Sequence, residues 1–422
     1  MAMSGQPQRF HIHTLGCPKN DVDSDKLVGT LVADGMVAAD SAEDADLVVV
    51  NTCAFIEDAR QESIDTVLAL DEVRRDDARL VVTGCMAERY GDELAEALPE
   101  IDAVAGFGVP VQLGVKPAGL LVTAEAVPSF DLLNLPRPTS SRPWAYVKIA
   151  EGCDRRCGFC AIPSFRGKQR SRTVESILTE VDQLEAREIV LVAQDLASYG
   201  NDDDRRGAIV PLVKAVRERV ERVRLLYLYP TDLTDSLIDT ICDTGLPYFD
   251  LSLQHVSAPL VRRMRRWGNG QKFLDRIEAI RGREPAAAFR SNFIVGYPGE
   301  TEDDHAELVQ FVEEAQLDWC GFFTYSKEDG TYAADLDGEV PKSLMHERIR
   351  ELTELQDRIT AERRAALIGT EMSVLVDEPG VSRSFREAPE IDGIITVPTD
   401  LAPGKFHTVK VTDSMGPDLE AE

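Results

Sequence analysis

Three short apolar segments at the start of the chain alternate with longer helical segments, and this alternation constrains the fold more than any other feature. The apolar segments, RFHIHTL, DLVVVNT and RLVVTG, are predicted to be strands. The segments between and after them, such as DVDSDKLVGTLVADG and EDARQESIDTVLALDEV, carry apolar residues at helical spacing. Strands that alternate with helices pair in parallel. We therefore expect an open parallel-sheet domain over residues 7–124.

A cysteine follows the end of each of these three strands. Cys17, Cys53 and Cys85 stand in the segments HTLGC, VVNTC and VVTGC. The carboxyl ends of parallel strands share one rim of the sheet, where ligands bind, so thiols that are far apart in the sequence can meet there. The alternative is three unrelated, half-buried cysteines, which the recurrence of the same placement in three successive units disfavours.

The rest of the chain predicts two further domains. Residues 125–143 are rich in Pro and Ser and are typical of a linker. Six strand-like segments, beginning with WAYVKIA, alternate with helices over residues 144–366, which indicates a partial TIM-like (β/α)6 barrel with its chemistry at the carboxyl ends of the strands. Residues 367–422 contain short strands and suit a small all-β barrel or sandwich. The predicted fold class is α/β, with an all-β C-terminal domain.

The segment EGCDRRCGFC follows the first barrel strand and holds three cysteines, Cys153, Cys157 and Cys160. Soft thiolates favour zinc or iron–sulfur clusters. Three protein ligands suit a 4Fe–4S cluster that keeps one iron open, as a catalytic metal site does. A zinc site would need a fourth ligand, for which His255 is the candidate at a strand end. We predict that a substrate takes the remaining position.

The spacing of these cysteines resembles that of the radical S-adenosylmethionine superfamily. The segments TLGCPKN, NTCAFIEDA and TGCMAER resemble the N-terminal domain of the methylthiotransferases within it, and SLQHVS, FIVGYPGETEDD and FFTYSKEDGT resemble their barrel. The tail resembles their small TRAM domain, which recognises substrate.

This resemblance implies two 4Fe–4S clusters and S-adenosylmethionine, which serves both as radical source and as methyl donor. The implied ligands are Cys17, Cys53 and Cys85 for an auxiliary cluster and Cys153, Cys157 and Cys160 for the radical cluster. No side chain is assigned as an acid or base, because a cofactor supplies the means to attack an unactivated C–H bond.

Further residues at the barrel rim are implied to contact S-adenosylmethionine, with a purely structural role as the alternative for each. They are Phe159, Gln194, Asp195, Gln254, Arg290, Gly296 and Pro298. Two basic segments, FRGKQRSR and RRMRRWGNGQK, either meet carboxylates of the substrate or cofactor or form solvated faces.

Methylthiotransferases act either on N6-isopentenyl-adenosine of transfer RNA, at C2, or on the β-carbon of an aspartate in protein twelve of the small ribosomal subunit. The tail segment SRSFREAPEIDGII resembles the enzymes that modify the ribosomal protein. The net charge is −28, from 74 acidic and 46 basic residues, and residues 367–422 contain eleven acidic against four basic residues. An RNA-binding module should be basic, whereas an acidic one suits a basic ribosomal protein. The ribosomal protein is the predicted substrate and transfer RNA the alternative.

An iron–sulfur cluster carrier is the alternative from another functional class, although a carrier needs neither a barrel nor a tail domain. We expect a cytoplasmic protein, because the N-terminus lacks a cationic and apolar leader and no segment has the length of a membrane span. The chemistry also implies an electron donor, such as a flavodoxin or ferredoxin.

Overall fold

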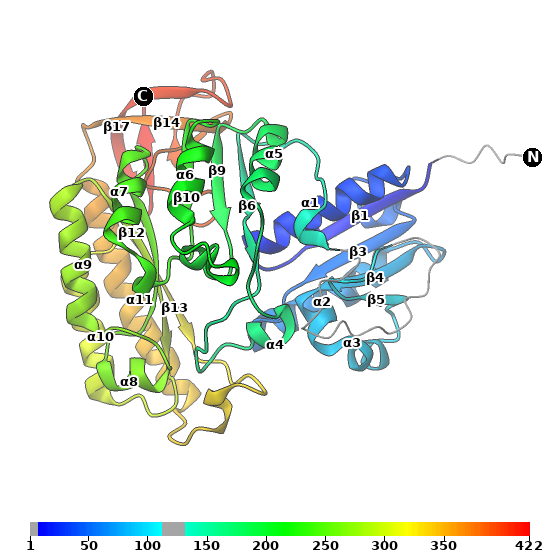
Figure 1. Cartoon of the computed structure of the whole chain (residues 1–422), viewed down its shortest axis with the longest axis horizontal. Coiled ribbons are helices and arrows are strands. Elements are labelled where there is room, and N and C mark those ends of the chain that lie inside the picture. Colours follow the sequence, from blue (N-terminus) through cyan, green and yellow to red (C-terminus); the bar gives the residue numbers. More distant parts are fainter. Residues whose placement is uncertain (1–6, 112–130) are drawn as a thin grey trace, which may run out of the picture. The chain divides into compact units, whose positions relative to one another are not determined.

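The computed structural model describes residues 7–111 and 131–422, which divide into two compact units (Figure 1). The first unit contains the described residues up to Thr139 together with residues 146–155 and 160–183. The second unit contains residues 140–145, 156–159 and 184–422. The segment around the C-x3-C-x2-C motif therefore contributes to both units. No helix in the described ranges is long and apolar enough to cross a membrane.

The first unit is built on a five-stranded parallel sheet of order β2-β1-β3-β4-β5. Its strands are β1 (Arg9–Thr14), β2 (Val37–Ala38), β3 (Leu47–Thr52), β4 (Arg79–Gly84) and β5 (Ala103–Ala105). All six residues of the central strand β3 are buried, as expected for a strand covered on both faces. The three predicted strands are confirmed as β1, β3 and β4.

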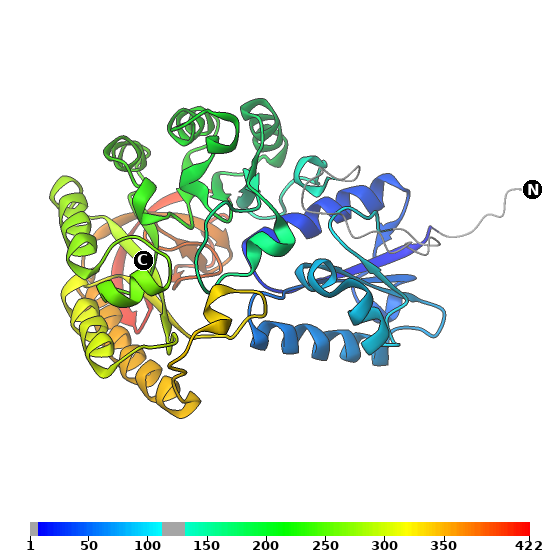
Figure 2. The same cartoon turned by 60° about the horizontal axis from the view of Figure 1, so that its bottom comes forward.

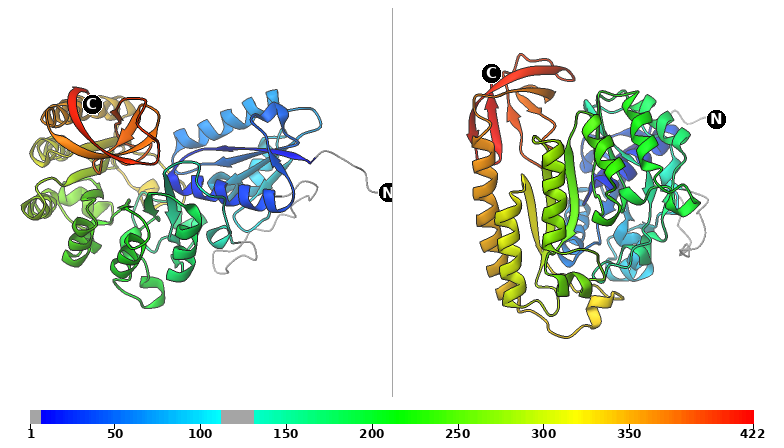
Figure 3. Two further views of the ribbon diagram at one scale, coloured as in Figure 1. Left: turned by 90° about the horizontal axis from the view of Figure 1, so that it is seen from above. Right: turned by 60° about the vertical axis from the view of Figure 1, so that its left-hand side comes forward.

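Helices cover both faces of this sheet. They are α1 (Pro18–Ala33), α2 (Glu57–Val73) and α3 (Cys85–Ala97). Leu27 of α1 packs with alternate residues of the strands such as Val49, whereas Val67 of α2 packs with Val48 and Val50 on the other face. Figure 3 shows α1 and α2 on opposite sides of the sheet.

Part of the predicted linker belongs to the first unit and packs on α1. Residues 125–130 lie outside the described residues. Leu132 is buried with Leu27 of α1, and the carbonyl of Leu133 accepts a hydrogen bond of 2.6 Å from Lys26 Nζ. A Cβ at Gly29 would lie 2.6 Å from the carbonyl oxygen of Pro136. The segment from residue 131 to 137 therefore follows α1 closely.

The barrel strands form two three-stranded sheets of order β10-β9-β6 and β11-β12-β13, and all of them except most of β6 lie in the second unit. The strands are β6 (Trp144–Lys148), which begins in this unit, β9 (Glu188–Val192), β10 (Arg222–Leu225), β11 (Tyr248–Gln254), β12 (Ala288–Val295) and β13 (Trp319–Thr324). A parallel bridge between Leu228 and Leu251 links the two sheets. The predicted partial barrel is confirmed, and Figure 2 shows its helices as an arc outside the strands.

The main helices that follow the barrel strands are α5 (Val174–Leu184), α6 (Ile209–Arg217), α7 (Asp235–Asp243), α9 (Gly270–Arg283), α10 (Glu302–Ala315) and α11 (Lys342–Ala365). The shorter elements are α4 (Ile162–Arg166), α8 (Ala258–Arg263) and the antiparallel pair β7 (Ala150–Glu151) and β8 (Arg170–Ser171). The cap of α10 is complete, since the Thr301 hydroxyl accepts from the Asp304 amide and the Asp304 carboxylate accepts from the Thr301 amide.

The tail forms a closed barrel of order β14-β15-β16-β18-β17, which confirms the predicted all-β domain. Its strands are β14 (Glu371–Glu378), β15 (Val381–Arg383), β16 (Ile395–Thr396), β17 (Phe406–Met415) and β18 (Asp418–Ala421). Val374, Val409 and Leu419 belong to its core.

The tail barrel belongs to the same unit as the larger barrel, because buried charges join the two. Glu188, the first residue of β9, forms ion pairs with Arg224 at 2.8 Å and with Arg383 of β15 at 3.3 Å. Arg224 also donates a hydrogen bond of 2.9 Å to the carbonyl of Phe385.

The tail segment EAPEIDG (residues 387–393) makes further contacts of this kind. Glu387 is buried and paired with Arg364 of α11, and Asp392 accepts a hydrogen bond of 2.6 Å from the Tyr248 hydroxyl. Only Glu390 of this segment is exposed. The segment that carries the resemblance to the ribosomal-protein enzymes therefore fixes the tail barrel to β11 and α11.

Candidate active site

The structure brings the three N-terminal cysteines to one edge of the first sheet. Cys17 precedes α1 as its N-cap, Cys53 follows the last residue of β3, and Cys85 is the first residue of α3, directly after β4. The strands β1, β3 and β4 are neighbours in the sheet. Cys53 and Cys85 are buried and Cys17 is half-buried. Their role as cluster ligands remains a prediction.

A glycine allows the loop before Cys17 to approach Cys53 closely. Gly16 has a φ of +99°, and a Cβ at this position would lie 2.9 Å from Cys53 Cβ and 3.1 Å from Cys53 Sγ. Gly84 has a φ of +88°, and a Cβ there would lie 2.3 Å from Asn51 Oδ1. Glycine is required at both positions because any side chain would collide with its neighbours.

The protein environment keeps the thiols of Cys53 and Cys85 protonated in the absence of metal. Burial and, to a smaller extent, the nearby Cys85 raise the pKa of Cys53 to about 11. Burial also raises the pKa of Cys85, although the Arg166 guanidinium opposes this shift. Because a metal binds the thiolate, metal binding must displace these protons.

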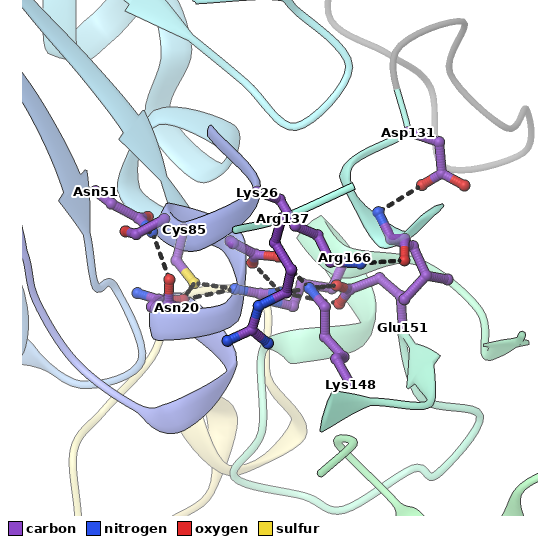
Figure 4. A network of polar contacts seen from close by, with 12 residues as sticks. Asn20, Lys26, Asn51, Cys85, Asp131, Arg137, Lys148, Glu151 and Arg166 are labelled. Atoms are coloured by element: carbon purple, nitrogen blue, oxygen red, sulfur yellow. Dashed lines mark hydrogen bonds and ion pairs between the residues drawn. The ribbon is translucent and has the colours of Figure 1, made fainter. Parts of the chain in front are cut away.

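A buried arginine contacts one of the three sulfurs (Figure 4). Arg166, the last residue of α4, donates from Nη2 to Cys85 Sγ at 3.0 Å and to Asn20 Oδ1 at 2.9 Å. Its Nη1 donates to Glu151 Oε1 at 2.9 Å. The ring of Phe107 lies 4.5 Å from the guanidinium carbon. The guanidinium is thereby held on two sides by polar groups and on its face by a ring.

Asn20 of α1 connects the loops that carry the cysteines. Its side chain is fully buried, and Nδ2 donates to the carbonyls of Leu15 at 2.7 Å and Thr52 at 3.1 Å. Leu15 lies two residues before Cys17, and Thr52 lies directly before Cys53. Asn20 thus ties two of the cysteine loops together and holds the arginine that contacts the third cysteine.

Four buried charges balance one another beside this site. Lys148 of β6 is paired with Asp23 of α1 and, at 2.6 Å, with Glu151, while Arg166 lies 3.6 Å from Asp23. Burial alone would raise the pKa of Glu151, but Arg166 and Lys148 outweigh burial and hold this pKa far below its ordinary value. Glu151 therefore remains charged in the interior between two cations.

The three cysteines of the C-x3-C-x2-C motif are half-buried and divide between the units. In the first unit, the amide of Cys153 donates to the carbonyl of Gly167 at 3.1 Å. In the second unit, Cys157 Sγ accepts a hydrogen bond of 3.0 Å from Arg266 Nη1, and this guanidinium lies 4.3 Å from the ring centre of Tyr229. Each cysteine motif therefore has a sulfur that accepts a hydrogen bond from an arginine side chain.

In the two described parts of the chain, no three or more His, Cys, Asp or Glu side chains are arranged to hold a single metal ion. The His255 ring is fully buried, and its Nδ1 accepts a hydrogen bond of 3.1 Å from the amide of Ser257.

The structure gives Phe159 a packing role. Its ring packs against a buried cluster that includes Leu260, Met264 and Tyr297. The neighbouring Gly158 donates to the carbonyl of Met264 at 2.8 Å. These contacts fix the loop between the second and third cysteines, and contact of Phe159 with a cofactor remains a prediction.

Three other predicted residues lie at the carboxyl ends of barrel strands. Gln194 and Asp195 follow β9, and Asp195 is buried. Gln254 is the last residue of β11 and has a φ of +74°. This position is compatible with the predicted contact between these residues and S-adenosylmethionine, and that contact stays a prediction.

Packing accounts for the GYPGE turn after β12. Gly296 has a φ of +84°, and a Cβ there would lie 2.4 Å from Met345 Cγ of α11. Its amide donates to Glu300 Oε2 at 2.5 Å, and Pro298 is buried. Neither residue requires a ligand to explain its identity, so their contact with the adenosyl group stays a prediction.

Arg290 lies in the predicted fifth barrel strand, away from the residues at the carboxyl ends of the strands, and its contact with S-adenosylmethionine stays a prediction. It lies near the start of β12, at the end opposite to Gly296. Its guanidinium is paired with Asp250 at 3.2 Å and with Asp392 of the tail at 3.4 Å. Arg290 is therefore a structural residue at the contact between the two barrels.

The sequence prediction missed Arg166 and Arg266 as site residues, although both lie in the two basic segments that it singled out. Neither arginine forms a solvated face, and each contacts a cysteine sulfur instead. Lys148 gave a usable signal, because a lysine in the otherwise apolar strand segment WAYVKIA indicates a buried ion pair.

Three family models match the chain. They are the uncharacterized protein family UPF0004 at residues 9–106, the radical SAM superfamily at residues 147–312 and the TRAM domain at residues 368–422. The ribosomal protein uS12 methylthiotransferase RimO of Kineococcus radiotolerans is 41% identical and aligns with 99% of this chain and 98% of its own. The enzyme of the same name from Moorella thermoacetica is 42% identical, over 96% of each chain. The chain belongs to the uS12 methylthiotransferase family. The resemblance predicted from the six cysteines and their flanking motifs is thereby confirmed.

Solved structures resemble this uS12 methylthiotransferase family member only distantly. The radical S-adenosylmethionine methyltransferase TsrM of Kitasatospora setae, with cobalamin and a [4Fe-4S] cluster bound, has a TM-score of 0.49 and 14% identity, over 78% of this chain and 74% of its own. A likeness of this size carries no argument about function.

Proposed function

We propose that the chain methylthiolates the β-carbon of an aspartate in ribosomal protein uS12, as a radical S-adenosylmethionine enzyme. The observation that carries this proposal is the near-complete alignment with uS12 methylthiotransferases. The proposed site of action is the cytoplasm, where ribosomal proteins are made and assembled.

The donor sets fit two 4Fe–4S clusters. Each set consists of three thiols, which are the soft ligands that iron–sulfur clusters take, and each leaves one coordination position of the cluster to a small molecule. Cys17, Cys53 and Cys85 would hold the auxiliary cluster. Cys153, Cys157 and Cys160 would hold the radical cluster. When bound, the clusters and S-adenosylmethionine supply hydrogen abstraction, sulfur and the methyl group.

The residues of the chain then bind and orient rather than transfer protons. Asn20 fixes the loops that carry Cys17 and Cys53, and Gly16 lets these loops meet. Arg266 orients Cys157 through its hydrogen bond to the sulfur. Such contacts outside the ligand set orient ligands and adjust the electronic properties of a metal site.

Charge supports a basic protein as substrate. The excess of acidic residues in the tail barrel attracts a basic ribosomal protein and repels an RNA backbone. A flavodoxin or ferredoxin is the proposed electron donor. Transfer RNA is the substrate that the experiment must exclude.

The test incubates reconstituted enzyme, S-adenosylmethionine and a chemical reductant with uS12 or with transfer RNA, and both acceptors are analysed by mass spectrometry. We expect a methylthio group on uS12 alone. A Cys157→Ala variant should be inactive, whereas Cys242→Ala, which alters a cysteine outside both motifs, should be active. Modification of transfer RNA alone, or of neither acceptor, would refute the proposal.

A further inference from the structure

We propose that Arg166 is a positioning residue of the auxiliary site, whose charge and hydrogen bond to Cys85 raise the reduction potential of the cluster held there. This inference rests on the proposed function, because it requires a cluster on Cys17, Cys53 and Cys85.

The hydrogen bond between Arg166 and Cys85 is held in place by further contacts of the guanidinium. Arg166 Nη2 lies 3.0 Å from Cys85 Sγ and 2.9 Å from Asn20 Oδ1. Asn20 is itself fixed by two backbone carbonyls, those of Leu15 and Thr52. The guanidinium cannot leave the sulfur without breaking its bonds to Asn20 and Glu151 as well.

Arg166 presents its positive charge directly to the Cys85 sulfur. On its other side Arg166 faces Glu151 and Asp23, whose charges Lys148 also shares. These four groups sum to zero in formal charge, so Arg166 acts on the thiolates through its direct contact with Cys85 Sγ at 3.0 Å and not through a net charge of the group. Hydrogen bonds to cysteine sulfurs and the net local charge both set the reduction potential of an iron–sulfur cluster. A buried cation bonded to a ligand sulfur stabilises the reduced, more negative cluster.

Arg166 lies in the segment that also carries the C-x3-C-x2-C motif. Arg166 follows Cys160 by six residues, and Glu151 precedes Cys153 by two. Both lie in the first unit, and the amide of Cys153 is bonded to the carbonyl of Gly167, next to Arg166. The residues that flank the radical motif thus supply the charge at the auxiliary site.

The test isolates the auxiliary cluster by replacing Cys153, Cys157 and Cys160 with alanine in the full-length chain. Removal of Arg166 alone would leave two buried carboxylates with one lysine, so Glu151→Gln is introduced first. Two proteins are then compared that differ only at Arg166: the background with Glu151→Gln, and the same protein with Arg166→Gln added. Iron per chain and the midpoint potential, from a redox titration followed by electron paramagnetic resonance, are measured for both. Arg75→Gln, an exposed arginine beyond the other end of the sheet, is the control.

We expect equal iron in the two proteins and a more negative midpoint potential in the one that lacks Arg166, with no shift for Arg75→Gln. Equal potentials with cluster present would overturn the role of Arg166 and leave the proposed function standing. Loss of iron only with Arg166→Gln would also overturn it, because Arg166 would then hold the cluster rather than set its potential. Absence of iron from the background itself would refute the auxiliary cluster and this inference together.

Discussion

Glu188 and Arg383 form a fully buried ion pair of 3.3 Å, which joins the first residue of β9 to the last residue of the tail strand β15. Arg224 contacts the same carboxylate at 2.8 Å. Burial alone would raise the pKa of Glu188, but Arg383 and Arg224 lower it to about 2, so the group is charged throughout the neutral range. One carboxylate therefore holds two guanidinium groups at the contact between the barrels.

Glu188→Gln should lower the free energy of unfolding by about 3–5 kcal/mol, because it leaves the buried Arg224 without its carboxylate. Arg383, in contrast, keeps its ion pair with Asp377. The measurement is denaturant unfolding of the full-length protein. Glu218→Gln, at an exposed position of the same unit, should change stability by less than about 0.5 kcal/mol. Equal effects of the two substitutions would show that the ion pair does not stabilise the contact.

Because His255 is buried, we expect the free energy of unfolding to decrease in mild acid. Burial lowers its pKa to about 4, so between that value and the ordinary 6.5 the unfolded chain binds a proton that the folded chain excludes. Stability should therefore fall as the pH decreases through this window, by about 2 kcal/mol between pH 7 and pH 5. In metal-free protein, His255→Gln should remove most of this dependence, as unfolding at both pH values would reveal. An unchanged pH dependence in the variant would assign the effect to other groups.

Cys157→Ala should lower the iron content of anaerobically purified protein by about half, because one of two proposed clusters loses a ligand. Iron analysis and absorption spectroscopy measure this loss. Cys242→Ala, with a half-buried cysteine on α7, serves as the matched control and should retain all of the iron. Full iron in the Cys157 variant would contradict the ligand assignment.

Cys53→Ala should abolish transfer of the methylthio group while reductive cleavage of S-adenosylmethionine continues. The physical reason is that the buried Cys53 is a proposed ligand of the auxiliary cluster and not of the radical cluster. Chromatography of 5′-deoxyadenosine and mass spectrometry of uS12 separate the two reactions. Methylthiolated uS12 from this variant would remove the auxiliary cluster from the proposed reaction.

The sequence was sufficient for the parallel sheet and the barrel, because their strands are continuous apolar runs such as DLVVVNT, which forms the buried β3. It was also sufficient to place the thiols of Cys17, Cys53 and Cys85 at one edge. Short strands such as β15, with three residues, carry no readable period and were missed.

The buried polar contacts around Arg166 and Lys148 could not be predicted from sequence patterns. Lys148 is paired with Asp23, 125 residues away, and Arg166 with Cys85, 81 residues away. Nothing local in a sequence specifies such pairs, since they depend on how distant elements pack. The same limit applies to Arg290, whose partner Asp392 lies in the tail barrel. A charged residue within an apolar strand indicates that an oppositely charged partner exists, but it does not identify that partner.

The buried charges beside Cys85 determine which truncated forms of this protein can fold. Asp23 lies on α1, but its cationic partners, Lys148 and Arg166, come after residue 143, where the predicted linker ends. A fragment that stopped at that residue would keep the acid and lose both bases, so it should be insoluble or unfolded. A fusion of the first sheet to another barrel would fold only if it also included residues 146–183.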